Sequence, residues 1–319
     1  YPSEFTPESI SYYEDSADEL AIINYTSGTS GFSKGVMIPY RAIRSNLEFA
    51  AKVLPQMNNT SRVVSMLPTA HMYGLMFEVL YEMSCGAHVF FLSRLPSPKI
   101  IMQALAEVKP TLVIAVPLII EKIYKSKVKP VLEKAGIRFV MKLPGLEQVV
   151  MNKIKTELVN AFGAEFIEVI IGGAAFNKEV ESFFKKMEFP FTVGYGMTEC
   201  APIITYDGHE TAKLYSCGRI VPNMEMKIDS PDPQNIPGEL LVRGANVFLG
   251  YYKNEEATKE VLQEDGWFHT GDMGVIDADG YLFLRGRSKC MILGPSGQNI
   301  YPEEVEAVLD TRPYVLESL

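Results

Sequence analysis

The chain has 319 residues, with 47% hydrophobic residues and a formal net charge of −9. This composition is typical of a globular protein with a well-buried core, and its negative charge disfavours nonspecific binding to nucleic acid or to an anionic membrane, because both repel a negative surface. The longest apolar run, about residues 112–120, is too short to span a bilayer and contains Pro117.

The cysteines and the two ends of the chain carry further information. The four cysteines are far apart and form no C-x-x-C pair: Cys85, Cys200, Cys217 and Cys290. We therefore expect free thiols in a reducing compartment rather than disulfides or a zinc site. The chain begins at Tyr1 without a methionine and stops soon after the helix-like segment PEEVEAVL, so we expect a piece of a longer protein.

The first half of the chain alternates between two patterns. From Leu20 to about Val116, short apolar runs are separated by segments with helical spacing; the runs are LAIINY, RVVSML, AHVFFL and TLVIAV. This alternation predicts a parallel sheet covered by helices. Residues 121–162 are rich in Lys and Glu and predict helices with a solvated positive face. The alternation resumes with AEFIEVIIGGA, a helix that begins after Asn177, and FPFTVGYG.

After Cys200 the pattern changes to short strands rich in Pro and Gly. The segments MEMKI, GELLVRG and MGVIDADGYLFLRGR predict antiparallel strands, and Asp279-Gly280 predicts a hairpin turn in the last of them. We expect a smaller β-rich subdomain here. In the parallel part, we expect ligands where loops leave the carboxyl ends of strands.

The stretch YTSGTSGFSKGV, residues 25–36, has the residue types of a phosphate-binding loop. Its glycines allow close backbone approach, its hydroxyls and amides offer donors to anionic oxygens, and Lys34 adds a positive charge. The G-x-x-x-x-G-K-[ST] pattern is not met from Gly28, because Ser33 precedes the lysine and Gly35 follows it. The alternative interpretation is a flexible Ser/Thr/Gly connector.

Three later stretches suit the same kind of ligand. In GYGMTEC, Thr198 and Glu199 offer a hydroxyl beside a carboxylate, which suits a Mg²⁺–phosphate complex. In WFHTGDMG, Asp272 follows a tight turn and could accept hydrogen bonds from ribose hydroxyls. LRGRSKC carries Arg285, Arg287 and Lys289. The alternatives are an exposed glutamate in a turn, a common turn aspartate and a charged strand edge.

Together and in this order, these stretches resemble the signatures of the adenylate-forming (AMP-binding) superfamily: acyl-CoA synthetases, adenylation domains of peptide synthetases, and luciferases. The signatures are YTSGTSGFSKGV, YGMTE, HTGDMG and GRSK…SGQNIYPEEVE, and the resemblance runs from about Asp18 to the last residue. It implies an α/β fold of mostly parallel sheets flanked by helices, plus a smaller antiparallel β-rich subdomain. Residues 1–288 would be a partial large domain, and residues 289–319 the hinge and the start of a truncated C-terminal domain.

The resemblance also implies roles for individual residues. The residues that would hold the β- and γ-phosphates of ATP are Thr26, Ser27, Gly28, Thr29, Ser30, Gly31 and Lys34. Adenine would lie beside Gly172, Gly173, Ala174 and Tyr195. Thr198 would contact phosphate, Glu199 would hold Mg²⁺, and Lys34, Thr198 and Glu199 would form the catalytic set. Asp272 and Arg287 would bind the ribose, Gly196 would contact both nucleotide and substrate, and Lys289 would be the hinge.

The reaction implied by the resemblance has two halves. A substrate carboxylate attacks the α-phosphorus of ATP, which gives an acyl-adenylate and pyrophosphate; a thiol then attacks the activated carbonyl and AMP leaves. The protein contributes positioning and positive charge rather than a covalent nucleophile. The resemblance implies that most of the C-terminal domain, with the lysine that relatives use for adenylation, lies outside this chain, and that an early segment of the large domain does so too. We therefore expect this chain by itself to be a poor enzyme that binds nucleotide weakly. Cys290 stands where relatives more often carry an acid or an amide.

The stretch PTAHMYGL, residues 68–75, bears on the substrate. Amino-acid-activating relatives usually carry an aspartate in this region, whereas here no acid occurs until Glu78, which favours a fatty or aryl acid. We assign His71 to the substrate site by resemblance to acyl-CoA synthetases; the alternative is a hydrogen-bonded core histidine. GGAAFNKEVESFF, TECAPIIT and ILGPSGQNIYPEEVE most resemble bacterial long-chain fatty acid–CoA ligases.

The leading hypothesis is therefore an ATP- and Mg²⁺-dependent ligase that joins a fatty acid to coenzyme A. Two alternatives stay open: transfer of the acyl group to a carrier-protein thiol, and a non-catalytic acyl-nucleotide binding module. The expected partners are fatty acid, ATP and coenzyme A, without nucleic acid. A cytoplasmic location fits the nucleotide and the free thiols, and an insoluble substrate is compatible with transient membrane contact.

Overall fold

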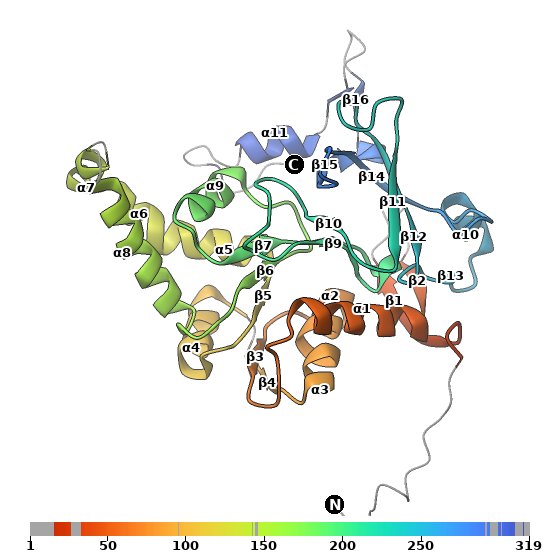
Figure 1. The fold of residues 1–319 in the computed structure, drawn as a ribbon, viewed down its shortest axis with the longest axis horizontal. Coiled ribbons are helices and arrows are strands. Elements are labelled where there is room, and N and C mark those ends of the chain that lie inside the picture. Colours follow the sequence, from red (N-terminus) through yellow and green to blue (C-terminus); the bar gives the residue numbers. More distant parts are fainter. Residues whose placement is uncertain are drawn as a thin grey trace, which may run out of the picture.

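The computed structural model describes residues 16–26, 33–94, 96–141, 143, 146–290, 292–293, 299–300, 302–309 and 315. Within this part the chain has a mixed α/β fold (Figure 1), as predicted. The helical part lies at the left of the view and the long antiparallel strands at the right. Among the described residues, no helix combines the length and the apolar character needed to cross a bilayer.

The first apolar run does not join the parallel sheet, so that prediction was wrong. Strand β1 (Leu20–Thr26) pairs antiparallel with β2 (Lys34–Pro39), and β13 (Gly250–Tyr251) pairs with the other edge of β2. The physical reason is the length of the connection. A parallel crossover needs a dozen or more residues, whereas residues 27–33 are enough only for a hairpin loop. The glycine-rich loop therefore joins two antiparallel strands, with Thr26 opposite Lys34 at its base.

The other predicted parallel strands are confirmed. Strand β3 (Arg62–Ser65) pairs with β4 (His88–Phe91), and β6 (Val169–Ile171) lies between β5 (Val113–Ala115) and β7 (Phe191–Val193), all in parallel. A parallel bridge between Val63 and Leu112 brings the two sheets together. Strands β5, β6 and β7 are short runs of mostly buried apolar and β-branched residues, as is typical of a parallel sheet covered by helices. Strand β4 is largely exposed.

Helices fill most of the intervals between these strands. Those before β5 are α1 (Tyr40–Val53), α2 (Met72–Gly74), the π-helical turn η2 (Leu75–Leu80), α3 (Tyr81–Cys85) and α4 (Pro98–Val108). Those after it are α5 (Pro117–Ile123), the π-helical turn η3 (Tyr124–Val128), α6 (Lys129–Leu132), α7 (Ala135–Val140), α8 (Leu146–Ala161), α9 (Lys178–Lys186), α10 (Glu255–Val261) and α11 (Pro302–Leu309). As predicted, Asn177 caps α9: its side chain accepts hydrogen bonds from the backbone N–H groups of Glu179 and Val180 at 3.0 and 3.2 Å.

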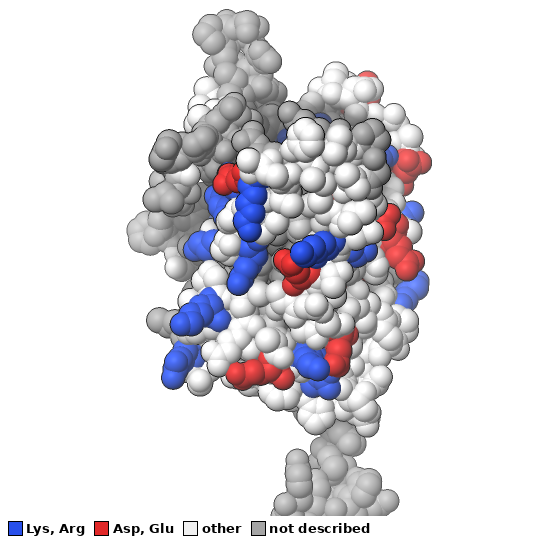
Figure 2. All heavy atoms as spheres, turned by 90° about the vertical axis from the view of Figure 1, so that its left-hand side faces the viewer, with Lys and Arg blue, Asp and Glu red and all other residues white. Residues whose placement is uncertain are grey.

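The prediction of helices over residues 121–162 is confirmed by α5 to α8. Their solvent side is the face seen in Figure 2, where Lys and Arg are spread together with Asp and Glu. Lys125 and Lys127 are exposed there, while Tyr124 and Val128 of the same turn are buried. This arrangement agrees with a solvated surface.

The predicted β-rich part is antiparallel. Its four-stranded sheet has the order β11 (Met224–Asp229), β12 (Gly238–Gly244), β14 (Phe268–Ile276) and β15 (Leu282–Arg287). The β14–β15 turn is the predicted one, with Gly280 at a φ of 84° and a hydrogen bond from the Asp277 N–H to the Tyr281 carbonyl at 3.1 Å. The remaining elements are β8 (Tyr195–Gly196), the 3₁₀ turn η4 (Thr198–Cys200), β9 (Ile203–Tyr206), β10 (Arg219–Ile220), the 3₁₀ turn η5 (Ser288–Cys290), β16 (Ile292–Leu293) and β17 (Asn299–Ile300).

Two buried acids lie on one side of η2 and α3, one helical turn apart. Glu78 accepts hydrogen bonds from the Ser65 hydroxyl and from the Met66 and Leu67 N–H groups at 3.0 to 3.2 Å, and burial raises its pKa to about 7. Glu82 is also fully buried, and neither of its carboxyl oxygens has a hydrogen-bond partner among the described residues. Burial, and then the nearby charge of Glu78, raise the pKa of Glu82 to about 8. Glu82 is therefore protonated near neutral pH in the folded chain.

Substituting Glu82 by Gln should flatten the pH dependence of stability. Between the ordinary pKa of 4.5 and the folded pKa of about 8, the folded state keeps a proton that the unfolded state has released. Stability therefore falls as the pH rises through this window. Because Gln is neutral throughout, Glu82→Gln should lose less stability than the native chain between about pH 5 and about pH 8, measured as urea midpoints.

The matched control is Glu157→Gln, which makes the same chemical change at an exposed position of α8. It should leave the pH dependence unchanged. If Glu82→Gln and the native chain lost equal stability across the window, the protonated state of Glu82 would be wrong.

Candidate active site

One cavity of about 830 Å³ collects most of the predicted site residues. It lies where the carboxyl ends of β5 and β6 meet β8, the β1–β2 hairpin and the end of β15. The predicted residues that line it are Thr26, Lys34, His71, Gly172, Gly173, Tyr195, Gly196, Thr198, Glu199 and Arg287. Segments far apart in the sequence therefore converge on one site, as the motifs predicted.

The glycine-rich loop is described only at its base. Thr26 ends β1 and Lys34 begins β2, and both line the cavity. Residues Ser27, Gly28, Thr29, Ser30 and Gly31 lie outside the described residues. The hairpin does bring the two ends of this loop to the cavity. Its role toward phosphate stays a prediction.

Glu199 is held by a tyrosine that the sequence motifs did not indicate. Glu199 is 8% exposed, and the Tyr251 hydroxyl donates to its carboxylate Oε1 at 2.9 Å. The ammonium of Lys34 lies 4.6 Å from the centre of the Tyr251 ring. Tyr251 reaches this place because β13 pairs with β2, with Tyr251 opposite Val36. No local pattern indicates a strand pairing between segments so distant in the chain.

Burial and the nearby positive charges shift the pKa of Glu199 in opposite directions. Burial raises the pKa of its carboxyl, while the hydrogen bond from Tyr251 and the charges of Arg287 and Lys34 lower it. Glu199 is therefore a desolvated acid close to cationic groups. A carboxyl with a perturbed pKa at the wall of a cavity is typical of a site that binds charged ligands.

The donor set at Glu199 fits a magnesium ion that shares its ligands with phosphate. Thr198 and Glu199 offer hard oxygen atoms side by side at the cavity wall. Across the described residues, no group of three or more His, Cys, Asp or Glu could hold a metal ion. Mg²⁺ is commonly bound through one or two carboxylates, with substrate phosphates and water completing its octahedron. The site suits that mode and does not suit an all-protein cage.

The segment that carries Glu199 is fixed from behind by α1. The buried side chain of Asn46 donates to the Cys200 carbonyl at 3.3 Å and accepts from the Ile203 N–H at 3.1 Å. The glycine at position 196 has a steric reason: a Cβ there would approach the Pro202 carbonyl oxygen to 2.2 Å. Only glycine therefore lets β8 run so close to the turn that follows it.

Asp272 and Arg287 face each other across the β14–β15 pair. Their Cα atoms are register partners, and the Arg287 Nε lies 3.3 Å from one carboxylate oxygen of Asp272. The Tyr195 hydroxyl donates to the other oxygen at 2.5 Å. Burial raises the pKa of Tyr195 well above its usual value, and the charge of Asp272 adds to this, so the hydroxyl stays a donor. Asp272 lies just behind the cavity wall, where Thr270 and Gly271 form the lining.

The Gly172–Ala174 segment follows β6 directly. A Cβ at Gly172 would come within 3.2 Å of the Tyr73 ring, and Gly173 has a φ of 87°, so both positions suit glycine. Tyr73 lines the cavity and donates to the Ile170 carbonyl at 3.1 Å, a contact that no motif indicated. Ala174 is exposed and is not part of the lining.

The structure places His71 at the cavity, whereas it does not describe the side chain of Lys289. His71 is exposed at the start of α2 and lines the cavity, so the alternative of a core histidine is wrong. Glu78, the first acid after it, is buried in the core and does not line the cavity. Lys289 follows β15 in the η5 turn, and its side chain lies outside the described part. Its hinge role and the domain boundary before it stay predictions.

The cavity has an apolar arm in addition to this polar end. Its lining comes from α1, the end of β3, η2, α3, β5 and β9: Phe49, Ala50, Val53, Leu54, Leu67, Phe77, Tyr81, Leu112, Ile114, Ile203 and Tyr206. None of these side chains is charged at neutral pH, which agrees with the apolar lining predicted for the substrate. One continuous cavity therefore joins a charged region to a hydrocarbon-like region.

Comparison with known proteins gives the family. The model of the AMP-binding enzyme family matches residues 4–252. The chain is 31% identical over 328 residues to a long-chain-fatty-acid–CoA ligase, ACSBG2, of Gallus gallus, covering 95% of this chain and 43% of that protein. It is 28% identical over 317 residues to the ACSBG2 ligase of Rattus norvegicus, covering 92% of this chain and 47% of that protein. The chain thus spans less than half the length of these relatives.

A solved structure agrees in fold. O-succinylbenzoate coenzyme A synthetase (MenE) from Bacillus subtilis, in complex with ATP and a magnesium ion, superposes with a TM-score of 0.74 at 26% identity. The match covers 95% of this chain and 57% of that one. With the family model matching most of the chain, these findings show that the protein belongs to the AMP-binding enzyme family, with acyl-CoA ligases as its relatives.

Proposed function

We propose that the protein activates a long-chain fatty acid with ATP and transfers the acyl group to coenzyme A. The observation that carries the proposal is the single cavity that joins the Lys34–Glu199–Arg287 region to an uncharged apolar arm. The named activity of the ACSBG2 relatives and the ATP and magnesium of the MenE complex support it. Since the chain spans less than half of those relatives, the proposal concerns the full-length protein expected to contain it.

In the first half of the proposed reaction, a fatty acid carboxylate oxygen attacks the α-phosphorus of ATP. The bond from that phosphorus to the bridging oxygen breaks, and pyrophosphate leaves. Thr26, Lys34 and the loop between them would hold the departing phosphates, and Lys34 would face the charge that develops there. Asp272 would accept from the ribose hydroxyls, with Tyr195 and Arg287 keeping its carboxylate in place.

Thr198 and Glu199 would hold magnesium together with the phosphates. When bound, the ion neutralises phosphate charge and makes pyrophosphate a better leaving group. Tyr251 keeps the Glu199 carboxylate oriented at the cavity wall, and burial excludes water from around it. The buried carboxylate is thereby ready to act without rearranging when the nucleotide arrives.

In the second half, the coenzyme A thiol gives up its proton to solvent and its sulfur attacks the acyl carbonyl carbon. The bond from that carbon to the AMP oxygen breaks, and AMP leaves. The exposed His71 would lie beside the carboxyl end of the substrate, and the apolar arm would hold the hydrocarbon chain. The large domain would end near residue 288, and Lys289 would be the hinge to the part that follows.

The first test is pyrophosphate release by the full-length protein with Mg-ATP. The panel is acetate, octanoate, palmitate, benzoate and amino acids, each with and without coenzyme A. We expect the fastest release with palmitate and completed turnover only with coenzyme A. Preference for amino acids would contradict the proposal. Turnover with a carrier protein in place of coenzyme A would support the carrier alternative, and ATP binding without release would support a binding module.

Substituting Glu199 by Gln should lower the rate of adenylation by about 10²-fold, because the charge opposite the phosphates is lost while the shape is kept. Tyr251→Phe should cost about tenfold, since it removes one charge-assisted hydrogen bond to that carboxylate but leaves the charge in place. The measurement is exchange of labelled pyrophosphate into ATP at several Mg²⁺ concentrations. Glu157→Gln, on the exposed side of α8, is the matched control. Equal rates for Glu199→Gln and the control would contradict the role of Glu199.

Substituting Asp272 by Asn should weaken discrimination between ATP and 2′,3′-dideoxy-ATP. If the carboxylate accepts from the ribose hydroxyls, charge-assisted hydrogen bonds become neutral ones, and the preference for ATP should drop about tenfold. The measurement is the ratio of kcat/KM for the two nucleotides. An unchanged ratio with a general loss of activity would assign Asp272 a purely structural role.

A further inference from the structure

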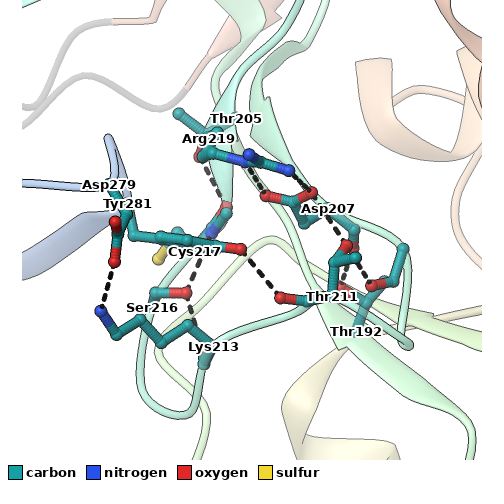
Figure 3. Close-up of polar contacts among 12 residues, drawn as sticks. Thr192, Thr205, Asp207, Thr211, Lys213, Ser216, Cys217, Arg219, Asp279 and Tyr281 are labelled. Carbon is teal, nitrogen blue, oxygen red and sulfur yellow. Dashed lines mark hydrogen bonds and ion pairs between the residues drawn. The ribbon is translucent and has the colours of Figure 1, made fainter.

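A second cavity of about 970 Å³, more open to solvent than the first, lies against the β-rich part of the molecule. The apolar side chains of its wall come from β10, the turn after it, β11 and β14: Ile220, Val221, Pro222, Met224, Met226 and Ile276. Charged residues also line it: Glu225, and Asp207, Arg219 and Asp279, which appear in Figure 3. No predicted site residue lines this cavity, and the proposed reaction does not use it.

The two cavities share part of their lining. Phe49 and Val53 of α1 and Tyr206 of β9 contribute to both. The rings of Phe49 and Tyr206 meet edge to face, with their centres 5.5 Å apart and an interplanar angle of 80°. These three side chains therefore stand between the two cavities, and we call them the partition.

Within the partition, Tyr206 is held by a hydrogen bond, whereas Phe49 is held only by packing. The Tyr206 hydroxyl donates to the buried carboxylate of Glu168, which also accepts from the backbone N–H of His209 at 3.0 Å. Phe49 has no polar atom in its side chain and lies next to the smaller, partly buried Val53. A change of rotamer at Phe49 therefore breaks no hydrogen bond, whereas displacing Tyr206 does.

The outer boundary of the second cavity is braced by charged groups (Figure 3). Arg219 binds both carboxylate oxygens of Asp207 at 2.8 Å. The Tyr281 ring lies 5.2 Å from the Arg219 guanidinium and 5.4 Å from the Lys213 ammonium, and its hydroxyl donates to the Thr211 carbonyl at 2.9 Å. This network joins β10 to the β14–β15 turn.

We propose that the second cavity receives the methyl end of long acyl chains, which reach it past Phe49. Phe49, Val53 and Tyr206 then set the acyl chain length that the protein prefers. This inference rests on the proposed function and names its substrate range. Its physical basis is that a methylene buried against apolar side chains is worth about fourfold in affinity, and proportionally less where it stays partly in contact with water. An acid that outgrows the apolar arm therefore gains by continuing along the apolar wall formed by Val221, Met224 and Ile276.

Opposite changes at Phe49 test the partition in the full-length protein. The measurement is kcat/KM for pyrophosphate release with saturated acids of increasing length. Phe49→Ala opens the partition and should raise the ratio of a 20-carbon to a 12-carbon acid by about 16-fold, the value of two further buried methylenes. Phe49→Trp fills the partition and should lower that ratio. Val53→Ala should act in the direction of Phe49→Ala with a smaller effect.

The matched control is Phe162→Leu, which changes a buried aromatic side chain that follows α8 and lines neither cavity. Its chain-length profile should equal that of the native protein. Melting temperatures accompany each variant, and Val53→Ala keeps the test open if Phe49→Ala does not fold, because it removes less buried volume.

A second measurement detects the acyl chain without any reaction. A 20-carbon acid with a photoreactive diazirine at its methyl end should label the peptides that contain Met224 or Ile276. The corresponding 12-carbon acid should label the peptides around Leu67 and Phe77 instead. Labelling of the second cavity by neither acid would overturn the inference.

The failures of the two proposals can be told apart. If the native protein activates no fatty acid, the proposed function fails. If it activates fatty acids but neither Phe49 variant changes the chain-length ratio, the proposed function stands and the partition is wrong.

Discussion

The burial of the Glu199 carboxylate is the constraint on which the rest of the site depends. An acid that is only 8% exposed costs free energy unless hydrogen bonds and positive charges compensate for the lost water. Here the compensation comes from the Tyr251 hydroxyl and from the charges of Lys34 and Arg287. Tyr251, Lys34 and Arg287 belong to β13, β2 and β15. The buried charge is therefore compensated only when these strands are correctly paired. The chain reaches this state only when distant strands are in register.

The cavity joins two environments that ordinarily exclude each other. Charged groups at one end and hydrocarbon side chains at the other both border one space, with Gly196 and the Asn46-supported turn between them. An amphipathic substrate with a carboxylate head and an apolar tail fits such a space, because each part of it meets its own kind of surface. The second cavity behind Phe49 and Tyr206 extends the apolar end toward the β-rich part of the molecule.

Local sequence patterns predicted where helices and strands lie better than they predicted which strands pair with each other. Continuous runs such as TLVIAV were correctly predicted as parallel strands, and Asn177 and Asp279-Gly280 correctly marked a helix start and a hairpin turn. The strand LAIINY was predicted, but it pairs antiparallel with β2 rather than in the parallel sheet. Hydrophobic periodicity reports which face of a segment is buried and says nothing about which strand lies beside it. Tyr251 and Tyr73 were missed for the same reason, since only tertiary packing brings them to the cavity.

The sequence by itself determined the family and the motif residues that line the polar end of the cavity. Its glycine, hydroxyl and carboxylate positions form motifs whose chemistry can be interpreted without a structure, and the family match over residues 4–252 agrees with them. Only the tertiary structure decided that the hairpin brings Lys34 to Glu199 by way of Tyr251, that Asp272 is held by Tyr195, and that Phe49 and Tyr206 divide two cavities. Cavities and long-range contacts depend on distances between segments that no stretch of sequence encodes alone, because they follow from how sheets and helices pack together.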